Sequence, residues 1–202
     1  MIAVIDSGVA NLRSVANALK HLGATARIAD APGDLTGADR IILPGVGAFA
    51  AGMTQLRNRG FVEPLRDLAR QGVPILGICL GMQLLFERSE EMGDTEGLGL
   101  LNGSIVRFPV DGPKVPHIGW NQLRQHGAPP LLKGVPVGSY AYFVHSYYAQ
   151  VASPDMILAD TSYGIDFPAV VGQGSVYGAQ FHPEKSQFTG LKLLANFMEM
   201  AA

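Results

Sequence analysis

Short apolar runs alternate with helical patterns through the first half of the chain, and this alternation constrains the fold more than any other feature. Strands are expected at residues 2–5, 25–28, 40–43 and 73–78, and helices at 11–22, 52–70 and 81–88. Pro64 is a candidate break within the second helix. Because strands joined through helices form right-handed crossovers, this pattern predicts an α/β fold with a mainly parallel central sheet flanked by helices.

The pattern changes after about residue 93, where short strand-like segments are separated by glycine and proline turns. These segments lie at residues 104–108, 120–123, 140–147, 157–161, 169–173 and 175–181, and a final helix is expected at 187–200. We expect them to form an antiparallel extension of the central sheet. Since no internal repeat or long linker divides the chain, one domain is expected.

The charge balance excludes several classes of partner. The 202 residues contain 15 basic and 17 acidic side chains, so the chain has no broad basic field for nucleic acid and no polybasic membrane anchor. Its apolar runs are far shorter than the ~20 residues that span a bilayer. The first residues, Met1 to Asp6, lack the basic region of a signal peptide, so a cytoplasmic location is expected.

A single cysteine, Cys79, excludes any internal disulfide and occupies an unusual position. An apolar strand precedes it, a helix follows it, and Gly77 and Gly81 stand two residues to either side. This is the cysteine form of the nucleophile elbow, in which the sulfur lies at a helix N-terminus that favours the thiolate. A lone cysteine after an apolar strand is more often a buried structural residue, but the two glycines favour catalysis.

A cysteine nucleophile needs a base that exchanges protons near neutral pH, and His182 is the best candidate among five histidines. It follows the segment 175–181, at a strand end where active sites of α/β folds collect. In extended chain Glu184 would face the same side and could orient the imidazole. Taken alone, His182-Pro-Glu184 is more often a surface turn. The chain has no metal-binding motif, and we expect neither metal nor cofactor.

Gly45-x-Gly47-x-x-Ala50 also fits the dinucleotide-binding fingerprint, which makes a nucleotide-binding domain the competing interpretation. Pro44 occupies the turn and these glycines do not follow the first strand, so this match is weak. Glycines in such a loop can instead present backbone N–H groups that complete an oxyanion hole opposite Cys79.

Together these motifs resemble those of the class I, triad-type glutamine amidotransferases, and the resemblance runs the whole length of the chain. It therefore implies one amidotransferase domain over residues 1–202. Within the family, the loop, the N-terminal segment and a third motif are similar to the glutaminase subunit of imidazole glycerol phosphate synthase. The motifs are Gly77-Ile-Cys79-Leu-Gly81-Met-Gln83, His182-Pro-Glu184, Pro44-Gly-Val-Gly-Ala-Phe49, Ile5-Asp-Ser-Gly8-x-x-Asn11-Leu and Pro116-His-Ile-Gly-Trp-Asn121. Ser7 departs from the tyrosine more common there.

The resemblance implies roles for residues that the pattern alone would leave as ordinary core or strand residues. Cys79, His182 and Glu184 would form the catalytic triad, and backbone N–H groups of Val46 or Gly47 and of Leu80 would form the oxyanion hole. Residues implied to contact glutamine are Gly45, Gln83, Glu91, His145, Ser146 and Tyr147, and those implied to face a partner are Asn11, His117, Ile118, Gly119, Trp120 and Asn121.

The implied activity is hydrolysis of glutamine through a thioester on Cys79. The implied partner is a (β/α)8-barrel cyclase that forms a heterodimer with this chain and uses the ammonia in histidine biosynthesis. Two alternatives remain open on the sequence: the amidotransferase subunit of another synthase, and a stand-alone cysteine hydrolase of related fold.

Overall fold

The computed structural model describes residues 1–8 and 11–200, and its centre is an eight-stranded sheet. The first five strands in spatial order are mutually parallel, and the remaining three run antiparallel to their neighbours. The spatial order is β2 (Ala26–Ala29), β1 (Ile2–Ile5), β3 (Arg40–Gly45), β4 (Ile75–Cys79), β14 (Val176–Ala179), β13 (Ile165–Gln173), β12 (Ile157–Tyr163) and β9 (Arg124–Gln125). The predicted parallel sheet with an antiparallel extension is confirmed.

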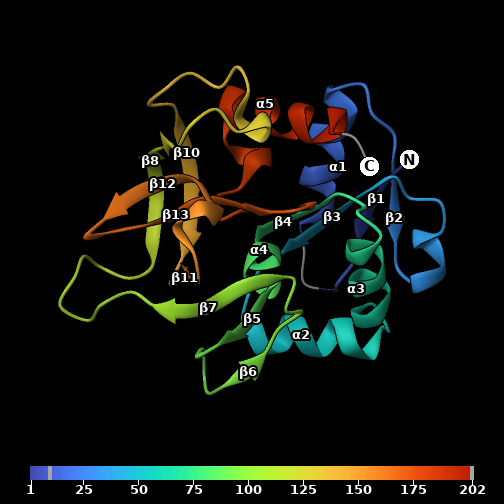
Figure 1. Cartoon of the computed structure of the whole chain (residues 1–202), viewed down its shortest axis with the longest axis horizontal. Helices are drawn as coiled ribbons and strands as arrows, with labels where there is room; N and C mark the ends of the chain where they lie inside the picture. Colours follow the sequence, from blue (N-terminus) through green and yellow to red (C-terminus); the bar gives the residue numbers. More distant parts are fainter. Residues whose placement is uncertain (9–10, 201–202) are drawn as a thin grey trace.

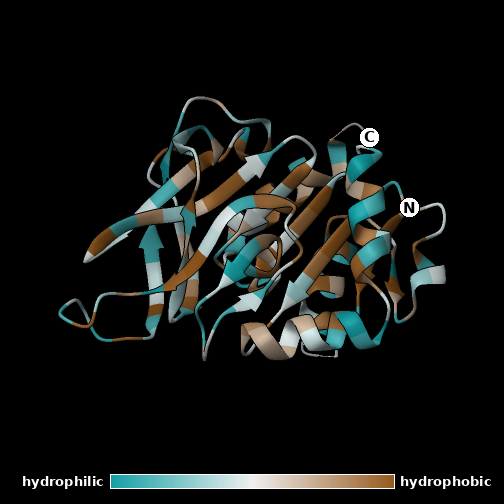
Figure 2. Cartoon of the chain, turned by 60° about the horizontal axis from the view of Figure 1, so that its bottom comes forward, coloured by the Kyte–Doolittle hydropathy of each residue, from teal (hydrophilic) through white to brown (hydrophobic). Residues whose placement is uncertain are grey.

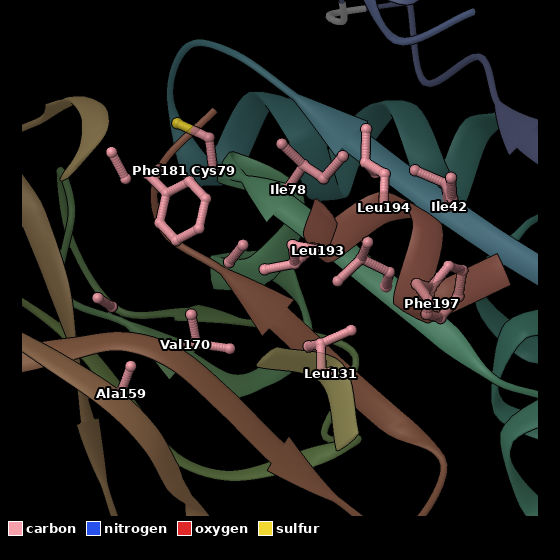
Figure 3. Close-up of a cluster of buried hydrophobic side chains, with 14 of the residues drawn as sticks. Ile42, Ile78, Cys79, Leu131, Ala159, Val170, Phe181, Leu193, Leu194 and Phe197 are labelled. Carbon is pink, nitrogen blue, oxygen red and sulfur yellow. The ribbon is translucent and has the colours of Figure 1, made fainter. Parts of the chain in front are cut away.

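Helices cover both faces of the parallel half, with α1 (Leu12–His21) and α5 (Gln187–Glu199) on one side and α2 (Phe49–Asn58) and α3 (Val62–Arg70) on the other (Figure 1). Alternate residues of each strand enter different cores, as the period of two requires: Val4 packs in the first core, and Ile5 in the second. Figure 3 shows the first core, where Leu193 and Phe197 of α5 pack toward Ile42. Burial of each large apolar side chain contributes about 1.5–3 kcal/mol.

Two smaller sheets stand beside the central one. The first pairs β8 (His117–Gln122) with β10 (Tyr140–His145), and the second has the order β11 (Tyr147–Val151), β7 (Leu101–Arg107), β5 (Phe86–Ser89) and β6 (Thr95–Glu96). The prediction that all strand-like segments after residue 93 extend one sheet is therefore wrong in part, because several of them build these separate sheets. Figure 2 shows the apolar character concentrated along the central strands, with hydrophilic stretches on the outer helices.

Several element boundaries differ from those expected. The helix predicted at 52–70 is two helices, and the break falls at Gly60, which has a positive φ of 75°, instead of at Pro64. Pro64 lies in the first turn of α3, where a helix needs no N–H donor. The helix predicted at 81–88 ends early as α4 (Leu80–Leu84), and the segment 140–147 is two strands separated at Ser146.

Short 3₁₀ helices complete the described chain: η1 (Pro32–Leu35), η2 (Pro130–Leu132), η3 (Pro154–Met156) and η4 (Pro183–Lys185). Each begins with proline, whose fixed φ and missing N–H suit a first helical position. Within residues 1–8 and 11–200, no helix is both long enough and apolar enough to cross a membrane.

Candidate active site

Cys79 forms a strained turn between β4 and α4, as the elbow motif predicted. Its φ of 54° and ψ of −112° lie outside the backbone regions that residues other than glycine normally adopt. A Cβ at Gly81 would overlap the carbonyl oxygen of Leu43 on the neighbouring strand, and one at Gly77 would lie 2.6 Å from Met82 Cα. Only glycine fits at either position, so the two residues permit the turn that presents the thiol.

The sulfur of Cys79 lies at the rim of the first core and points away from the packed side chains (Figure 3). The helix behind it is α4, whose five residues are fewer than expected. Its macrodipole is therefore smaller than that of the predicted helix. The main positive end of this helix is the set of N–H groups in its first turn, including that of Leu80.

His182 and Glu184 form a buried pair beside the elbow. They follow β14, which runs parallel to β4 with Ala179 opposite Ile78, so the two chain segments leave the sheet at the same edge. Nδ1 of His182 lies 2.8 Å from Oε1 of Glu184, and the two side chains are 3% and 1% exposed. The expected contact between the histidine and the carboxylate is confirmed, but Glu184 reaches the imidazole from the 3₁₀ helix η4 and not from extended chain.

The protonation of His182 is set by opposing effects. Burial lowers its pKa, but the Cys79 sulfur and the Glu184 carboxylate outweigh burial and raise the pKa from 6.5 to about 9. Nε2 of His182 forms no hydrogen bond with a described residue, and Sγ of Cys79 lies 3.9 Å from the Val144 carbonyl oxygen. At neutral pH the imidazole therefore carries a proton that is available on the side of the thiol.

The loop after β3 approaches the same elbow. Gly45 pairs in register with Cys79, and a Cβ at Gly45 would lie 3.0 Å from the Gly81 nitrogen. That space is filled by α4, so the glycine serves the packing of the elbow. The loop follows the third strand of the chain and not the first, which disagrees with the dinucleotide fingerprint. Gly47 has φ of 97°, and Val46 is a partly exposed residue beside the pocket.

One pocket of about 410 Å³ joins these parts, a volume within the range of small-molecule sites. All predicted triad, oxyanion and substrate residues line it except Gly45 and Glu184, which lie behind its wall. Pro116, Val144 and Lys185 were not predicted to line a pocket; Lys185 directly follows Glu184, the predicted triad carboxylate, and this is the only signal that could have indicated it. The lining residues are Val46, Gly47, Cys79, Leu80, Gln83, Glu91, Pro116, Val144, His145, Ser146, Tyr147, His182 and Lys185.

One acidic and one amide side chain of the pocket also form hydrogen bonds with the surrounding main chain. Oε2 of Glu91 accepts a hydrogen bond of 2.7 Å from the N–H of Phe49, at the start of α2. Nε2 of Gln83 donates to the carbonyl oxygen of Tyr147 at 3.0 Å. Both predicted substrate residues are therefore held in place by main-chain groups.

His117 was expected to face a partner, but its side chain is buried and belongs to the interior. Its Nδ1 lies 3.2 Å from Nε2 of His145, and its ring stacks on Phe143 and Tyr163. Burial lowers the pKa of His117 to about 4, and burial together with the neighbouring His117 and His182 lowers the pKa of His145 to about 3. Both imidazoles are neutral near pH 7.

The alternation along β8 leaves Ile118 and Trp120 on the surface, 60% and 47% exposed. Trp120 is therefore not a core anchor, and it lines a shallow hollow with Tyr140 and Phe188, two exposed residues that the sequence did not single out. The side chain of Asn11 caps α1 by accepting a hydrogen bond from the Ser14 N–H.

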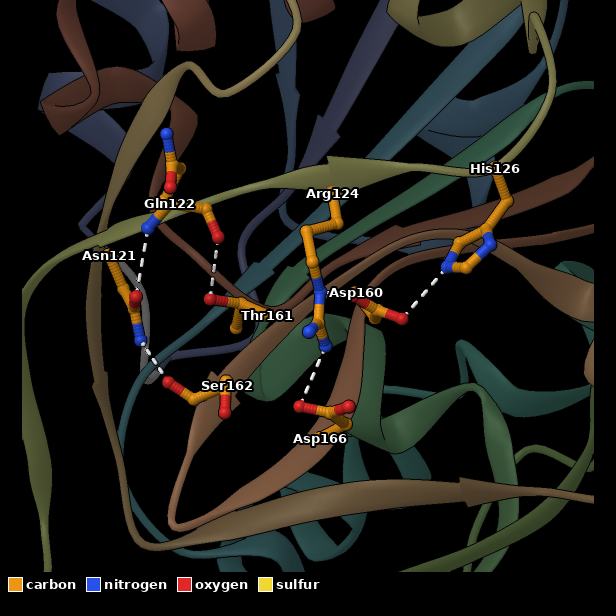
Figure 4. A network of polar contacts seen from close by, with 8 residues as sticks. All are labelled: Asn121, Gln122, Arg124, His126, Asp160, Thr161, Ser162 and Asp166. Atoms are coloured by element: carbon orange, nitrogen blue, oxygen red, sulfur yellow. Dashed lines mark hydrogen bonds and ion pairs between the residues drawn. The ribbon is translucent and has the colours of Figure 1, made fainter.

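A polar network holds the outer side of this region (Figure 4). Nδ2 of Asn121 donates to the Ser162 carbonyl oxygen at 2.9 Å, and the Arg124 guanidinium pairs with Asp160 and Asp166. These pairs are mostly solvent-exposed, so each contributes little to stability. Their effect is to attach β8 and β9 to the β12–β13 hairpin.

Comparison with known proteins agrees with this arrangement. The family model described as glutamine amidotransferase class-I matches residues 3–201. The chain is 53% identical over 197 residues to the imidazole glycerol phosphate synthase subunit HisH of Desulfitobacterium hafniense, covering 98% of this chain and 93% of the relative. It is 49% identical over 199 residues to the subunit of the same name from Moorella thermoacetica, covering 98% and 94%.

Solved structures agree on the fold. A glutamine amidotransferase superposes with a TM-score of 0.78 at 21% identity, covering 98% of both chains. A chain of PurLQS from Thermotoga maritima superposes with a TM-score of 0.75 at 20% identity, covering 98% of this chain and 96% of that one. From the match of the family model over nearly the whole sequence, the chain belongs to the class I glutamine amidotransferase family.

Proposed function

We propose that this chain is the glutaminase subunit of imidazole glycerol phosphate synthase, which hydrolyses glutamine and supplies the ammonia for histidine biosynthesis. The observation that carries the proposal is the identity of about half of all residues to subunits of that name, over nearly the full length of both chains. The convergence of Cys79, His182 and the Gly45–Gly47 loop on one pocket provides the chemistry that such a subunit needs.

Catalysis would begin when the Cys79 thiolate attacks the carboxamide carbon of glutamine. Backbone N–H groups of Leu80 and of Val46 or Gly47 would stabilise the developing oxyanion, since preorganised donors there typically contribute a factor of ~10²–10³ in kcat. His182, protonated at neutral pH because its pKa is raised, then gives its proton to the nitrogen, and ammonia leaves.

A γ-glutamyl thioester on Sγ remains after this step. The now neutral His182 accepts a proton from water as that water attacks the thioester carbonyl, and the Cys79 thiolate departs as glutamate is released. Glu184 keeps Nδ1 protonated throughout, so that Nε2 is the atom that exchanges the proton. The cycle returns every group to its starting state.

A (β/α)8-barrel cyclase forming a heterodimer with this chain is part of the proposal. The exposed apolar side chains of Ile118, Trp120, Tyr140 and Phe188 form a surface suited to such a contact, because aromatic residues are enriched at the centre of protein interfaces. A cytoplasmic location also belongs to the proposal.

The test is the release of glutamate from glutamine with and without the cyclase. We expect turnover by the wild-type complex, loss of turnover in Cys79→Ala, and labelling of Cys79 by a thiol-reactive glutamine analogue that glutamine prevents. Full activity of Cys79→Ala would overturn the proposal. Turnover of simple esters that ignores the cyclase would favour the stand-alone hydrolase instead.

A further inference from the structure

Gln180 is a fully buried polar residue that the catalytic scheme above does not use. Its main-chain N–H donates to the Ala169 carbonyl oxygen, which fixes it at the end of β14. Its side-chain Oε1 accepts a hydrogen bond of 3.0 Å from Nε2 of Gln83, while its own Nε2 has no partner among the described residues. A buried amide that leaves a donor unpaired is uncommon, and it calls for an explanation.

The explanation begins with the amide of Gln83, whose orientation is settled by a backbone group. The atom of Gln83 that lies 3.0 Å from the Tyr147 carbonyl oxygen must be the nitrogen, because a carbonyl can only accept. That nitrogen has two hydrogens, and the second is directed to Oε1 of Gln180. Both donors of Gln83 are therefore in use.

The same reasoning fixes Gln180. If its amide were reversed, its nitrogen would face the nitrogen of Gln83, and two donors would be opposed. Oε1 must therefore point to Gln83, and the unpaired Nε2 is the consequence. The Tyr147 carbonyl is held in turn by Nδ1 of His145 at 2.8 Å, whose Nε2 lies 3.2 Å from Nδ1 of His117.

This arrangement gives the pocket a group that can only accept hydrogen bonds. Oε1 of Gln83 accepts no hydrogen bond from a described residue, and the side chain lines the pocket. The Glu91 carboxylate lines it too, with Oε2 bonded to the Phe49 N–H and Oε1 without a described partner. Two acceptors in one pocket match an ammonium group, which has three donors and no acceptor.

We propose that Gln180 is a positioning residue that locks the amide of Gln83 with Oε1 toward the pocket. The family resemblance already implies that Gln83 contacts glutamine, and a fixed acceptor at this place suits the α-ammonium group of that substrate. The inference rests on the proposed glutaminase function. It assigns Gln180 to substrate selection instead of to the chemical step, because its effect passes through Gln83 and not through Cys79 or His182.

The experiment compares two variants of Gln180 in the complex with the cyclase. Gln180→Met has a similar length and no acceptor, whereas Gln180→Glu keeps an oxygen toward Gln83. We expect Gln180→Met to raise the KM for glutamine about tenfold with kcat within about twofold, and Gln180→Glu to restore most of the affinity. A general packing defect would not be rescued by the carboxylate.

The second measurement uses 4-carbamoylbutanoate, which is glutamine without its α-amino group, as substrate and as competitive inhibitor. Its KM or inhibition constant should be the same within about twofold in wild type and Gln180→Met, because it lacks the group that Gln83 recognises. An unchanged KM for glutamine in Gln180→Met, an equal weakening of both compounds, or a fall in kcat alone would overturn the proposal. Failure of the glutaminase function itself would show differently, as a wild-type complex that releases no glutamate.

Discussion

Replacing Glu184 by glutamine tests whether the buried carboxylate sets the proton affinity of His182. The substituted amide has the same shape and can still accept the hydrogen bond from Nδ1, so the orientation of the imidazole should persist. Only the negative charge is lost. Because the site is almost fully buried, that charge is poorly screened and its loss should be felt strongly.

The size of the effect follows from the pKa of His182, which stands at about 9 where 6.5 is ordinary. This difference corresponds to about 3 kcal/mol of preference for the protonated imidazole, shared between Cys79 and Glu184 against the opposing effect of burial. Without the carboxylate we expect the pKa of His182 to fall to about 7 or below. At about pH 8.5 the protonated fraction would then drop by roughly 25-fold, whereas at about pH 6 it would hardly change.

The assay is the pH dependence of kcat/KM for glutamate release by the complex with the cyclase, which reports the ionisations of the free enzyme. The wild-type profile should hold until about pH 9, and the alkaline limb of Glu184→Gln should move down by about two pH units. Glu199→Gln, an exposed position on α5, serves as the matched control and should keep the wild-type profile. An alkaline limb that stays in place in Glu184→Gln would refute the assignment of the raised pKa to this carboxylate.

Three further outcomes are expected. Gly81→Ala should lower the free energy of unfolding in urea by about 3 kcal/mol or more because its Cβ meets a main-chain oxygen, whereas Gly33→Ala, with open space around it, should change it little. The folded-state pKa values of His117 and His145 lie near 4 and 3, below the ordinary 6.5, so the unfolded chain binds their protons first as the pH falls. The free energy of unfolding should therefore be highest above pH 6.5 and should decrease by about 2 kcal/mol for each histidine between about pH 7.5 and pH 5. His117→Asn should reduce this pH dependence. Trp120→Ala should weaken binding of the cyclase by about 10- to 100-fold in calorimetry at an unchanged melting temperature, and an unchanged Kd would remove β8 from the interface.

The parts of the site that depend on local backbone could be predicted from the sequence. The turn at Cys79 needs glycine two residues before and after it, and this requirement is written in consecutive positions. The pairing of His182 with Glu184 spans a single intervening residue, although that residue, Pro183, begins a 3₁₀ helix where extended chain was expected. Such short-range geometry leaves few alternatives, so a motif of this kind indicates both the shape and the chemistry.

Features that depend on long-range pairing could not be predicted. Gln83 meets Gln180 across 97 positions of the sequence, and His117 meets His145 because the two stand opposite each other in the β8–β10 pair. The residues after Leu84 have helical spacing, yet Phe86 pairs with Leu101 of β7, and this strand pairing overrides the local preference. Apolar alternation indicates that a strand exists, and it does not say which sheet receives it.

The topology divides the pocket between two parts of the chain. The parallel strands β3, β4 and β14 end at one edge of the sheet and carry the proposed oxyanion loop, nucleophile and base. Between β4 and β14 the chain makes the two small sheets, and the junction of β10 and β11 there supplies the pocket wall at His145 to Tyr147. A sequence change in the segment between β4 and β14 should therefore alter which substrate the pocket binds, while the proposed reacting groups keep their positions. The buried bond between Gln83, behind the elbow, and Gln180, before His182, is where the two parts are held in register.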